Sequence, residues 1–129
     1  MPRVLFVCVA NSFRSQMAEA LAQAAARPGW EIWSAGSAPG GGVHPLAIQL
    51  MDELKLDLRG RRSKGLEAVP AGPWDYVVTM GCGDACPAVA AHRRLDWDLP
   101  DPAALPLEEA RRLRDDLKRR IEALLASHR

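Results

Sequence analysis

The sequence predicts one α/β domain, built as a doubly wound, four-stranded parallel sheet with helices on both faces. The chain has 129 residues, of which 48% are hydrophobic and 26% are charged. That length and composition suit a single globular domain spanning residues 1–129. Short apolar runs alternate along the chain with segments of helical periodicity, which is typical of β-α-β units. The sequence contains no internal repeat and no linker that would divide it.

Four segments have the pattern of strands. They are residues 3–7, 31–34, 75–80 and 95–99. The first carries the continuous apolar run VLFV and ends at Cys8, which indicates a strand covered on both faces. The third contains YVVTM, the strongest strand signal in the chain. The fourth, LDWDL, is the remaining strand candidate.

Three segments have the pattern of helices. The first starts at Arg14 and is stopped by Pro28 and Gly29, the second covers residues 45–55, and the third covers residues 107–127. Each has apolar residues at helical spacing, and Pro45 is a favourable first helical residue. Loops are expected at 36–42, 60–65, 81–87 and 100–106, with a short helical turn after the second of them.

The charge balance and the apolar runs exclude several classes of protein. Lys and Arg number 17 and Asp and Glu number 16, so the net charge of +1 gives no general attraction to nucleic acid or anionic membranes. The early apolar run of residues 4–10 is far shorter than the roughly 20 residues of a membrane span. Polar residues follow it without a small-x-small cleavage site, so we interpret it as a buried strand. We therefore expect a cytoplasmic monomer with no nucleic-acid or membrane partner.

The loop between the first strand and the first helix carries the clearest chemical motif. Cys8 ends the strand, and Arg14 and Ser15 open the helix, which gives the spacing C-x5-R-S. Backbone N–H groups of such a loop can surround a tetrahedral oxyanion, and the helix N-terminus adds positive charge. Arg14 can bind two oxyanion oxygens, while the same field and a hydrogen bond from Ser15 favour the Cys8 thiolate. The expected oxyanion-binding residues are Val9, Ala10, Asn11, Ser12, Phe13, Arg14 and Ser15, with Asn11 in a left-handed backbone conformation.

The segment VLFVCVANSFRSQMAEA resembles the amino-terminal signature of the low-molecular-weight protein tyrosine phosphatase fold family. The later segments WSAG, HPLAIQLM, YVVTMGCGDACP and WDLPDP resemble the thioredoxin-coupled arsenate reductase branch of that family. The resemblance covers nearly the whole chain. It implies that Cys8 is the nucleophile, that Arg14 and the loop amides hold the oxyanion, and that Asp101 is the general acid. Ala10 and Phe13 depart from the family, which often has glycine and cysteine there, but neither change removes a group that the chemistry needs.

The other two cysteines distinguish the reductase from the phosphatase. Cys82 and Cys86 follow the third strand at the edge of the sheet where Cys8 ends. They can be inert, contribute to a metal site, or form a redox relay. On a helical turn their Cα atoms would lie about 6 Å apart, within reach of a disulfide. A zinc site needs about four ligands at regular spacing, which the scattered histidines do not offer, so we expect no metal and no other cofactor.

The resemblance and the three cysteines together favour arsenate reduction for arsenic detoxification as the function. Arsenate, or a phosphate-like oxyanion, would bind the loop, and Cys8, Cys82 and Cys86 would pass a disulfide outward to a thioredoxin-like reductant. The alternatives are a tyrosine phosphatase, which needs only Cys8, Arg14 and the acid, and a non-catalytic anion- or arsenite-binding module. One tyrosine and two phenylalanines give a thin aromatic rim for phosphotyrosine.

Two further residue choices depend on the resemblance. Asp98 is the rival acid, and Asp101 is favoured because the family places its acid before a proline. Residues matching Asn11, Glu19 and Ser34 help to form a monovalent-cation site in the reductases. A further acidic ligand of that site, expected near Ser63, is replaced by Lys64, whose ammonium group can substitute for the ion.

His44, before Pro45, is expected to be a turn or cap residue.

Overall fold

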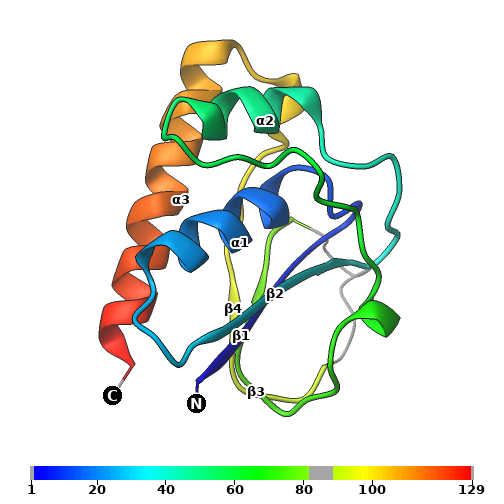
Figure 1. The fold of residues 1–129 in the computed structure, drawn as a ribbon, viewed down its shortest axis with the longest axis vertical. Coiled ribbons are helices and arrows are strands. Elements are labelled where there is room, and N and C mark those ends of the chain that lie inside the picture. Colours follow the sequence, from blue (N-terminus) through cyan, green and yellow to red (C-terminus); the bar gives the residue numbers. More distant parts are fainter. Residues whose placement is uncertain (1, 82–88, 129) are drawn as a thin grey trace.

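The computed structural model describes residues 2–81 and 89–128 and has one four-stranded sheet at its centre (Figure 1). The strands lie in the order β2-β1-β3-β4, and every neighbouring pair is parallel. They are β1 (Arg3–Cys8), β2 (Glu31–Gly36), β3 (Trp74–Thr79) and β4 (Ala91–Asp96). The predicted parallel sheet is therefore confirmed. β1 has a neighbouring strand on each side, and its continuous apolar run supplies both apolar cores, one on each face of the sheet.

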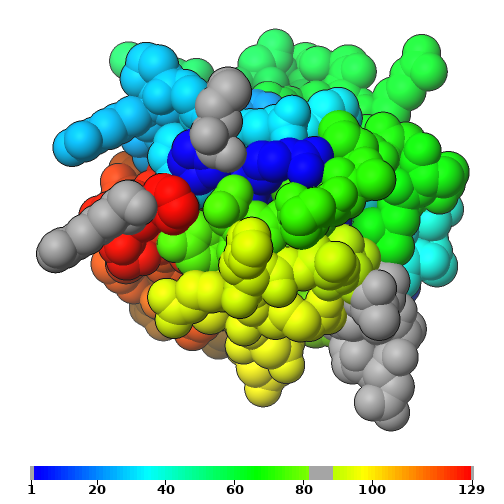
Figure 2. Space-filling model, turned by 90° about the horizontal axis from the view of Figure 1, so that it is seen from below, coloured from blue at the N-terminus to red at the C-terminus, as the bar shows by residue number. Residues whose placement is uncertain are grey.

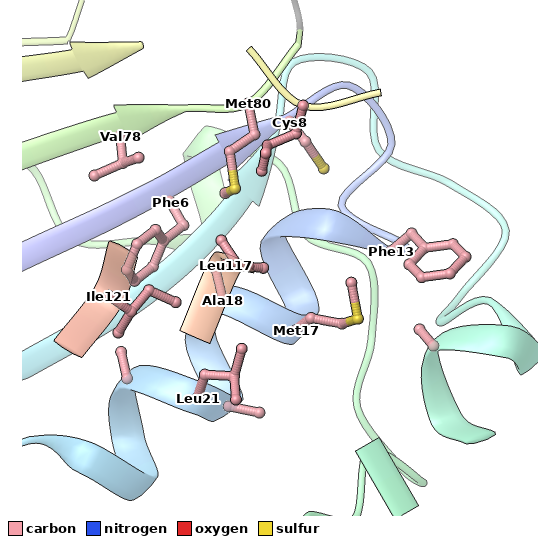
Figure 3. Packing of buried hydrophobic residues seen from close by; sticks show 14 of the residues in the cluster. Phe6, Cys8, Phe13, Met17, Ala18, Leu21, Val78, Met80, Leu117 and Ile121 are labelled. Atoms are coloured by element: carbon pink, nitrogen blue, oxygen red, sulfur yellow. The ribbon is translucent and has the colours of Figure 1, made fainter. Parts of the chain in front are cut away.

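Three α-helices gather on one face of the sheet (Figure 1). They are α1 (Arg14–Ala25), α2 (Pro45–Asp52) and α3 (Leu107–Ser127), and α1 packs against the other two. In Figure 3, Phe6 and Val78 of the strands lie close to Leu117 and Ile121 of α3. These residues belong to the larger of the two apolar cores, and their burial fixes the helical layer on the sheet.

The opposite face is covered by the later part of the connection between β2 and β3, which follows α2. This later part contains the 3-10 turn η1 (Leu66–Ala68), and its residues Leu66 and Val69 pack against Leu5 and Val7 of β1. Successive β1 side chains thus enter cores on opposite faces of the sheet. α1, between β1 and β2, and α2, which follows β2, lie on one face, and the segment after α2 crosses the other face before β3, which confirms the doubly wound architecture. In the described residues the cover is α-helical on the first face and a 3-10 turn with its flanking loop on the second.

The position of the fourth strand was predicted wrongly. The strand was expected over residues 95–99, LDWDL, whereas β4 is Ala91–Asp96. β4 lies at the edge of the sheet, and the charged or polar residues 92–94 on it are exposed. An edge strand of this kind avoids further pairing by carrying charge. It therefore lacks the apolar run by which the other strands were found.

Three shorter elements lie where the sequence predicted a helix or a loop, with adjusted bounds. The helix expected over residues 45–55 ends at Asp52, and Lys55 takes a left-handed φ of 61° in the turn that follows. The expected turn after residues 60–65 is η1, and the expected rigid loop at 100–106 contains a second 3-10 turn, η3 (Pro102–Ala104). α2 and η3 each begin with a proline, whose fixed φ favours the first residue of a helix.

The amino-terminal edge of the sheet lies at the opposite end of the strands from Cys8. Both described chain ends are at this edge (Figure 1), where His128 Nδ1 lies 3.0 Å from the Tyr76 hydroxyl and the His128 ring packs edge-on against Trp30. Figure 2 views the protein from this end, with the blue start of β1 and the red end of α3 on one face. Among the described residues, no helix has the length and apolar composition to cross a membrane.

An ion-pair cluster joins α2 to α3 and gives a prediction about stability. The Glu53 carboxylate accepts hydrogen bonds from Arg111 at 2.8 Å and from Arg114 at 2.5 Å. The bonds from Arg111 and then Arg114 lower the pKa of Glu53 from 4.5 to about 2. A depressed folded-state pKa stabilises the fold above the unfolded value, and that stability is lost as pH falls from about 4.5 towards 2.

We therefore expect the melting temperature of the wild type to fall more steeply between pH 5 and pH 2 than that of Glu53→Gln. Thermal unfolding followed by circular dichroism at several pH values measures both slopes. Glu122→Gln, which removes an exposed carboxylate of α3, is the matched control and should keep the wild-type slope. Parallel slopes for the wild type and Glu53→Gln would contradict the expectation.

Candidate active site

Residues 9–13 connect β1 to α1 in a tight loop at the carboxyl edge of the sheet. The carbonyls of this loop face outward, because they accept hydrogen bonds from the backbone that follows β2. The bonds run from Ser37 N to Cys8 O at 3.1 Å, from Ala38 N to Val9 O at 2.8 Å, from Gly40 N to Ala10 O at 3.3 Å and from His44 N to Ser12 O at 2.8 Å. With its carbonyls turned outward, the loop has its N–H groups available on the concave side, which is the arrangement that binds an oxyanion.

Gly36, the last residue of β2, allows the loop to approach the sheet. A Cβ at this position would lie 2.5 Å from Val9 O and 2.9 Å from Asn11 N. Both are backbone atoms, which cannot swing aside as the end of a side chain can. Gly36 was expected only as part of the glycine-rich loop, and this role was not predicted. A glycine at the carboxyl end of a strand, where backbones come close, was the available signal.

Cys8 is the last residue of β1 and is 3% exposed. Figure 3 shows it beside Met80, the residue that follows β3, and the backbone N–H of Met80 donates to Val7 O. The Cys8 Sγ lies 2.8 Å from Ser15 Oγ in the first turn of α1. Because Ser15 Oγ accepts a hydrogen bond from Asn11 Nδ2 at 2.7 Å, the hydroxyl proton of Ser15 is available for the sulfur. A hydrogen bond donated to sulfur stabilises its thiolate form.

Asn11 uses both ends of its side-chain amide. Its Nδ2 donates to Ser15 and, at 3.0 Å, to Ser34, while its Oδ1 accepts from Gln16 Nε2 at 2.9 Å and Lys64 N at 2.8 Å. If the amide were rotated by half a turn, Asn11 Nδ2 would face the N–H donors of Gln16 and Lys64, so the orientation of the amide is fixed. The backbone of Asn11 has a φ of 52°, which confirms the predicted left-handed conformation. The role of Gln16 was missed, since one polar residue in a helix gives no pattern.

Arg14, the first residue of α1, reaches the segment that carries the two candidate acids. Its Nη1 donates to Leu99 O at 2.8 Å. A Cβ at Gly81 would collide with the same nitrogen, and Gly81 has a φ of 74° that favours glycine in any case. The guanidinium therefore lies between the residue that follows the end of β3 and the acid-bearing segment.

Both candidate acids are exposed residues beside the point where Arg14 is bound. Asp101 is the cap of η3, and its Oδ1 accepts from Ala103 N at 3.0 Å. Asp98 lies on the other side of buried Leu99, whose carbonyl holds Arg14. The structure thus brings this segment to the Cys8 loop, and the preference for Asp101 rests on the family resemblance.

Cys82 and Cys86 lie outside the described residues. Gly81 is the last described residue before them, and it follows β3, the neighbour of β1 in the sheet. The chain therefore enters this segment at the carboxyl edge where Cys8 lies, as expected. Their redox roles stay a prediction from the sequence.

His44 is a cap residue, as expected. Its Nδ1 accepts a hydrogen bond from Leu46 N at 3.0 Å at the start of α2. Its ring also stacks on Phe13 of the Cys8 loop, with the ring centroids 4.9 Å apart. Phe13, one of the two departures from the family pattern, is thus buried against the cap of α2 and supports the loop from outside.

The residues that the resemblance assigned to a monovalent cation lie close together, but Lys64 lies among them. Its ammonium group is 3.4 Å from Ser34 Oγ and 3.8 Å from Glu19 Oε2. A metal cation bound by the same oxygen atoms would lie next to the ammonium group, and two positive charges so close repel strongly where water is partly excluded. The residues present therefore do not fit a metal cation in addition to this ammonium group.

The fold and the Cys8 loop together identify the class of protein to which the chain belongs. The family model described as "Low molecular weight phosphotyrosine protein phosphatase" matches residues 3–129. The chain belongs to this family, which confirms the resemblance.

Several relatives that match the chain along most of its length are arsenate reductases. The glutaredoxin arsenate reductase of Synechocystis sp. is 37% identical over 129 residues, which cover 98% of each chain. An arsenate reductase of Bacillus cereus is 37% identical over 92% of this chain and 90% of its own.

Solved structures agree. A structure described as an arsenate reductase in the phosphate binding state is 38% identical, covers 98% of each chain and superposes with a TM-score of 0.87. The thioredoxin-dependent arsenate reductase of Corynebacterium glutamicum has 36% identity and a TM-score of 0.78, over 98% of this chain and 61% of its own.

Proposed function

We propose that this protein is an oxidoreductase that reduces arsenate to arsenite, with Cys8 as nucleophile, and that it serves arsenic detoxification. The observation that carries the proposal is the similarity to arsenate reductases along nearly the entire chain, 37% over 98% in one case. The geometry supports it, because the buried Cys8 thiol faces the hydroxyl of Ser15 in a loop whose carbonyls point outward.

The first chemical step is nucleophilic. Arsenate binds the N–H groups of residues 9–15 and the Arg14 guanidinium, and the Cys8 thiolate attacks arsenic. A bond forms between sulfur and arsenic(V), one As–O bond breaks, and Asp101 protonates the departing oxygen so that it leaves as water. In this proposal Arg14 exchanges its partner, Leu99 O, for oxyanion oxygens.

The second stage moves two electrons. The Cys82 thiolate attacks Cys8 Sγ, the S–As bond breaks, and its electron pair reduces arsenic(V) to arsenite. Cys86 then attacks Cys82, which releases the Cys8 thiolate and leaves a Cys82–Cys86 disulfide. A dithiol partner of the thioredoxin or glutaredoxin type reduces this disulfide and completes the cycle. Both types occur in the descriptions of related enzymes.

The proposed cellular compartment follows from the chemistry of the cysteines. Three cysteines that cycle through free thiols need a reducing compartment, so we place the protein in the cytoplasm. Every proposed catalytic group comes from one chain, so we propose that the monomer is the active form.

An arsenate-dependent NADPH oxidation assay tests the proposed function. Thioredoxin with thioredoxin reductase, and glutaredoxin with glutathione and its reductase, are supplied in separate reactions. Oxidation that needs both arsenate and this protein, with one arsenite released per NADPH, is expected with at least one system. Hydrolysis of an aryl phosphate without arsenate-dependent oxidation in either system would identify a phosphatase instead.

Replacing Asp101 tests the assigned acid. Asp101→Asn keeps an acceptor that can cap η3 but cannot supply a proton, so turnover should fall by roughly 10²–10⁴-fold. Phosphate should still protect Cys8 from alkylation, because the oxyanion loop is intact. Asp98→Asn is the matched variant and should retain most activity. The opposite result for the two variants would make Asp98 the acid.

A further inference from the structure

A buried carboxylate lies beneath the Cys8 loop. Glu19, in α1, is 5% exposed, and a carboxylate so far removed from water needs cationic partners. Arg61 Nη1 lies 3.0 Å from Glu19 Oε1, and Lys64 Nζ lies 3.8 Å from Glu19 Oε2. Each oxygen of the carboxylate thus faces a positive charge that comes from the segment after α2.

Lys64 connects this carboxylate to the residues around Cys8. Its ammonium group donates to Ser34 Oγ at 3.4 Å, and its backbone N–H donates to Asn11 Oδ1. Ser34 is fully buried and also accepts from Asn11 Nδ2. Lys64 therefore contacts the Asn11 network through both its main chain and its side chain.

The same network ends at the reactive sulfur. Asn11 donates to Ser15 Oγ, which leaves the Ser15 proton for Cys8 Sγ. The backbone N–H of Lys64 binds Asn11 Oδ1 and so keeps Asn11 Nδ2 directed at Ser15, while the Lys64 ammonium group binds Ser34, the other acceptor of Nδ2. A loss of the ammonium charge would leave Glu19 with one cationic partner and would free Ser34 to reorient.

We propose that the ammonium group of Lys64 is a built-in cation of this site. It replaces a monovalent metal ion among Asn11, Glu19 and Ser34, and it is a positioning residue for Cys8 through Asn11 and Ser15. The inference rests on the proposed function for its catalytic meaning. Its geometry concerns only the thiol and its neighbours, so it can be tested without arsenate.

Wild-type protein provides the first test. Its melting temperature and its Cys8 alkylation rate at pH 6 should be the same in KCl, NaCl and choline chloride of equal ionic strength. Stabilisation or faster alkylation specific to KCl or NaCl would show that a metal cation still enters and would overturn the proposal. Peptide mapping by mass spectrometry identifies Cys8 as the alkylated thiol.

Variants of Lys64 provide the second test. Lys64→Met keeps an unbranched side chain but removes the charge, and it should slow Cys8 alkylation at pH 6 about fivefold, with the pH profile shifted upward. Lys64→Arg should restore most of the rate. Arg62→Met removes an exposed charge two residues away and should leave the rate unchanged. A wild-type pH profile in Lys64→Met would overturn the proposal.

Lys64→Asp gives the converse test. An aspartate with Glu19, Ser34 and Asn11 supplies oxygen ligands without the competing ammonium group, so the melting temperature of this variant should rise in KCl relative to choline chloride. Equal melting temperatures in the two salts would count against a cation position at Lys64. If these tests succeed while the NADPH assay shows no arsenate reduction, the proposed function fails and the role of Lys64 stands.

Discussion

Cys8→Ser is expected to abolish arsenate reduction and any phosphatase activity, because both reactions begin with attack by the same sulfur. A serine hydroxyl at this position is a far weaker nucleophile, and no base is positioned to activate it within the described loop. Arsenate-dependent NADPH oxidation should fall to the rate without enzyme. Phosphate binding, measured by calorimetry, should persist, since Arg14 and the loop N–H groups remain.

Alkylation of the wild type completes this test. Iodoacetamide should modify Cys8 at pH 6, and arsenate or phosphate should slow that modification, because the oxyanion would lie directly in front of the sulfur. Equal alkylation rates with and without oxyanion would contradict the assignment of residues 9–15 as the binding loop. Residual turnover in Cys8→Ser would place the nucleophile elsewhere.

Substitution of the other two cysteines is expected to stop the reaction at two different stages. Cys82→Ser should prevent arsenite release, because nothing displaces arsenic from Cys8. Cys86→Ser should release one arsenite per enzyme and stop at a Cys8–Cys82 disulfide. Rapid-quench measurement of arsenite and peptide mapping by mass spectrometry distinguish the two outcomes.

The arsenate-treated wild type should lose two hydrogens, with the final bridge between Cys82 and Cys86. A phosphatase would be indifferent to both substitutions, since water completes its cycle. Multiple turnovers by Cys82→Ser with the thioredoxin system would rule out the relay and favour a phosphatase-like enzyme or a direct external thiol.

The sequence predicted the fold where local pattern and burial agree. VLFV and YVVTM form the two central strands, which are covered on both faces, and the third helix has the predicted bounds of Leu107–Ser127. The fourth strand was misplaced because its residues 92–94 are exposed and carry no apolar signal. Pattern-based reasoning detects burial, so an edge strand is where it fails.

The candidate site was predictable to the extent that its residues are close in sequence. The C-x5-R-S spacing placed Cys8, Asn11 and Ser15 in one loop, and their mutual hydrogen bonds are present. Gln16 and Gly36 were missed, because their roles depend on which backbone lies across from them. Contacts of that kind arise only from the packing of distant segments.

The position of Arg14 has a consequence for protein engineering. Its guanidinium binds the carbonyl of Leu99 and fills the space where a Cβ of residue 81 would lie. Residue 81 immediately precedes Cys82, so the arginine, the acid-bearing segment and the start of the cysteine segment meet at one glycine. A designer who moves two thiols onto a phosphatase scaffold of this family should therefore transfer that glycine with them. A larger residue would push aside the end of the Arg14 side chain, the proposed oxyanion ligand, and would crowd Leu99 O.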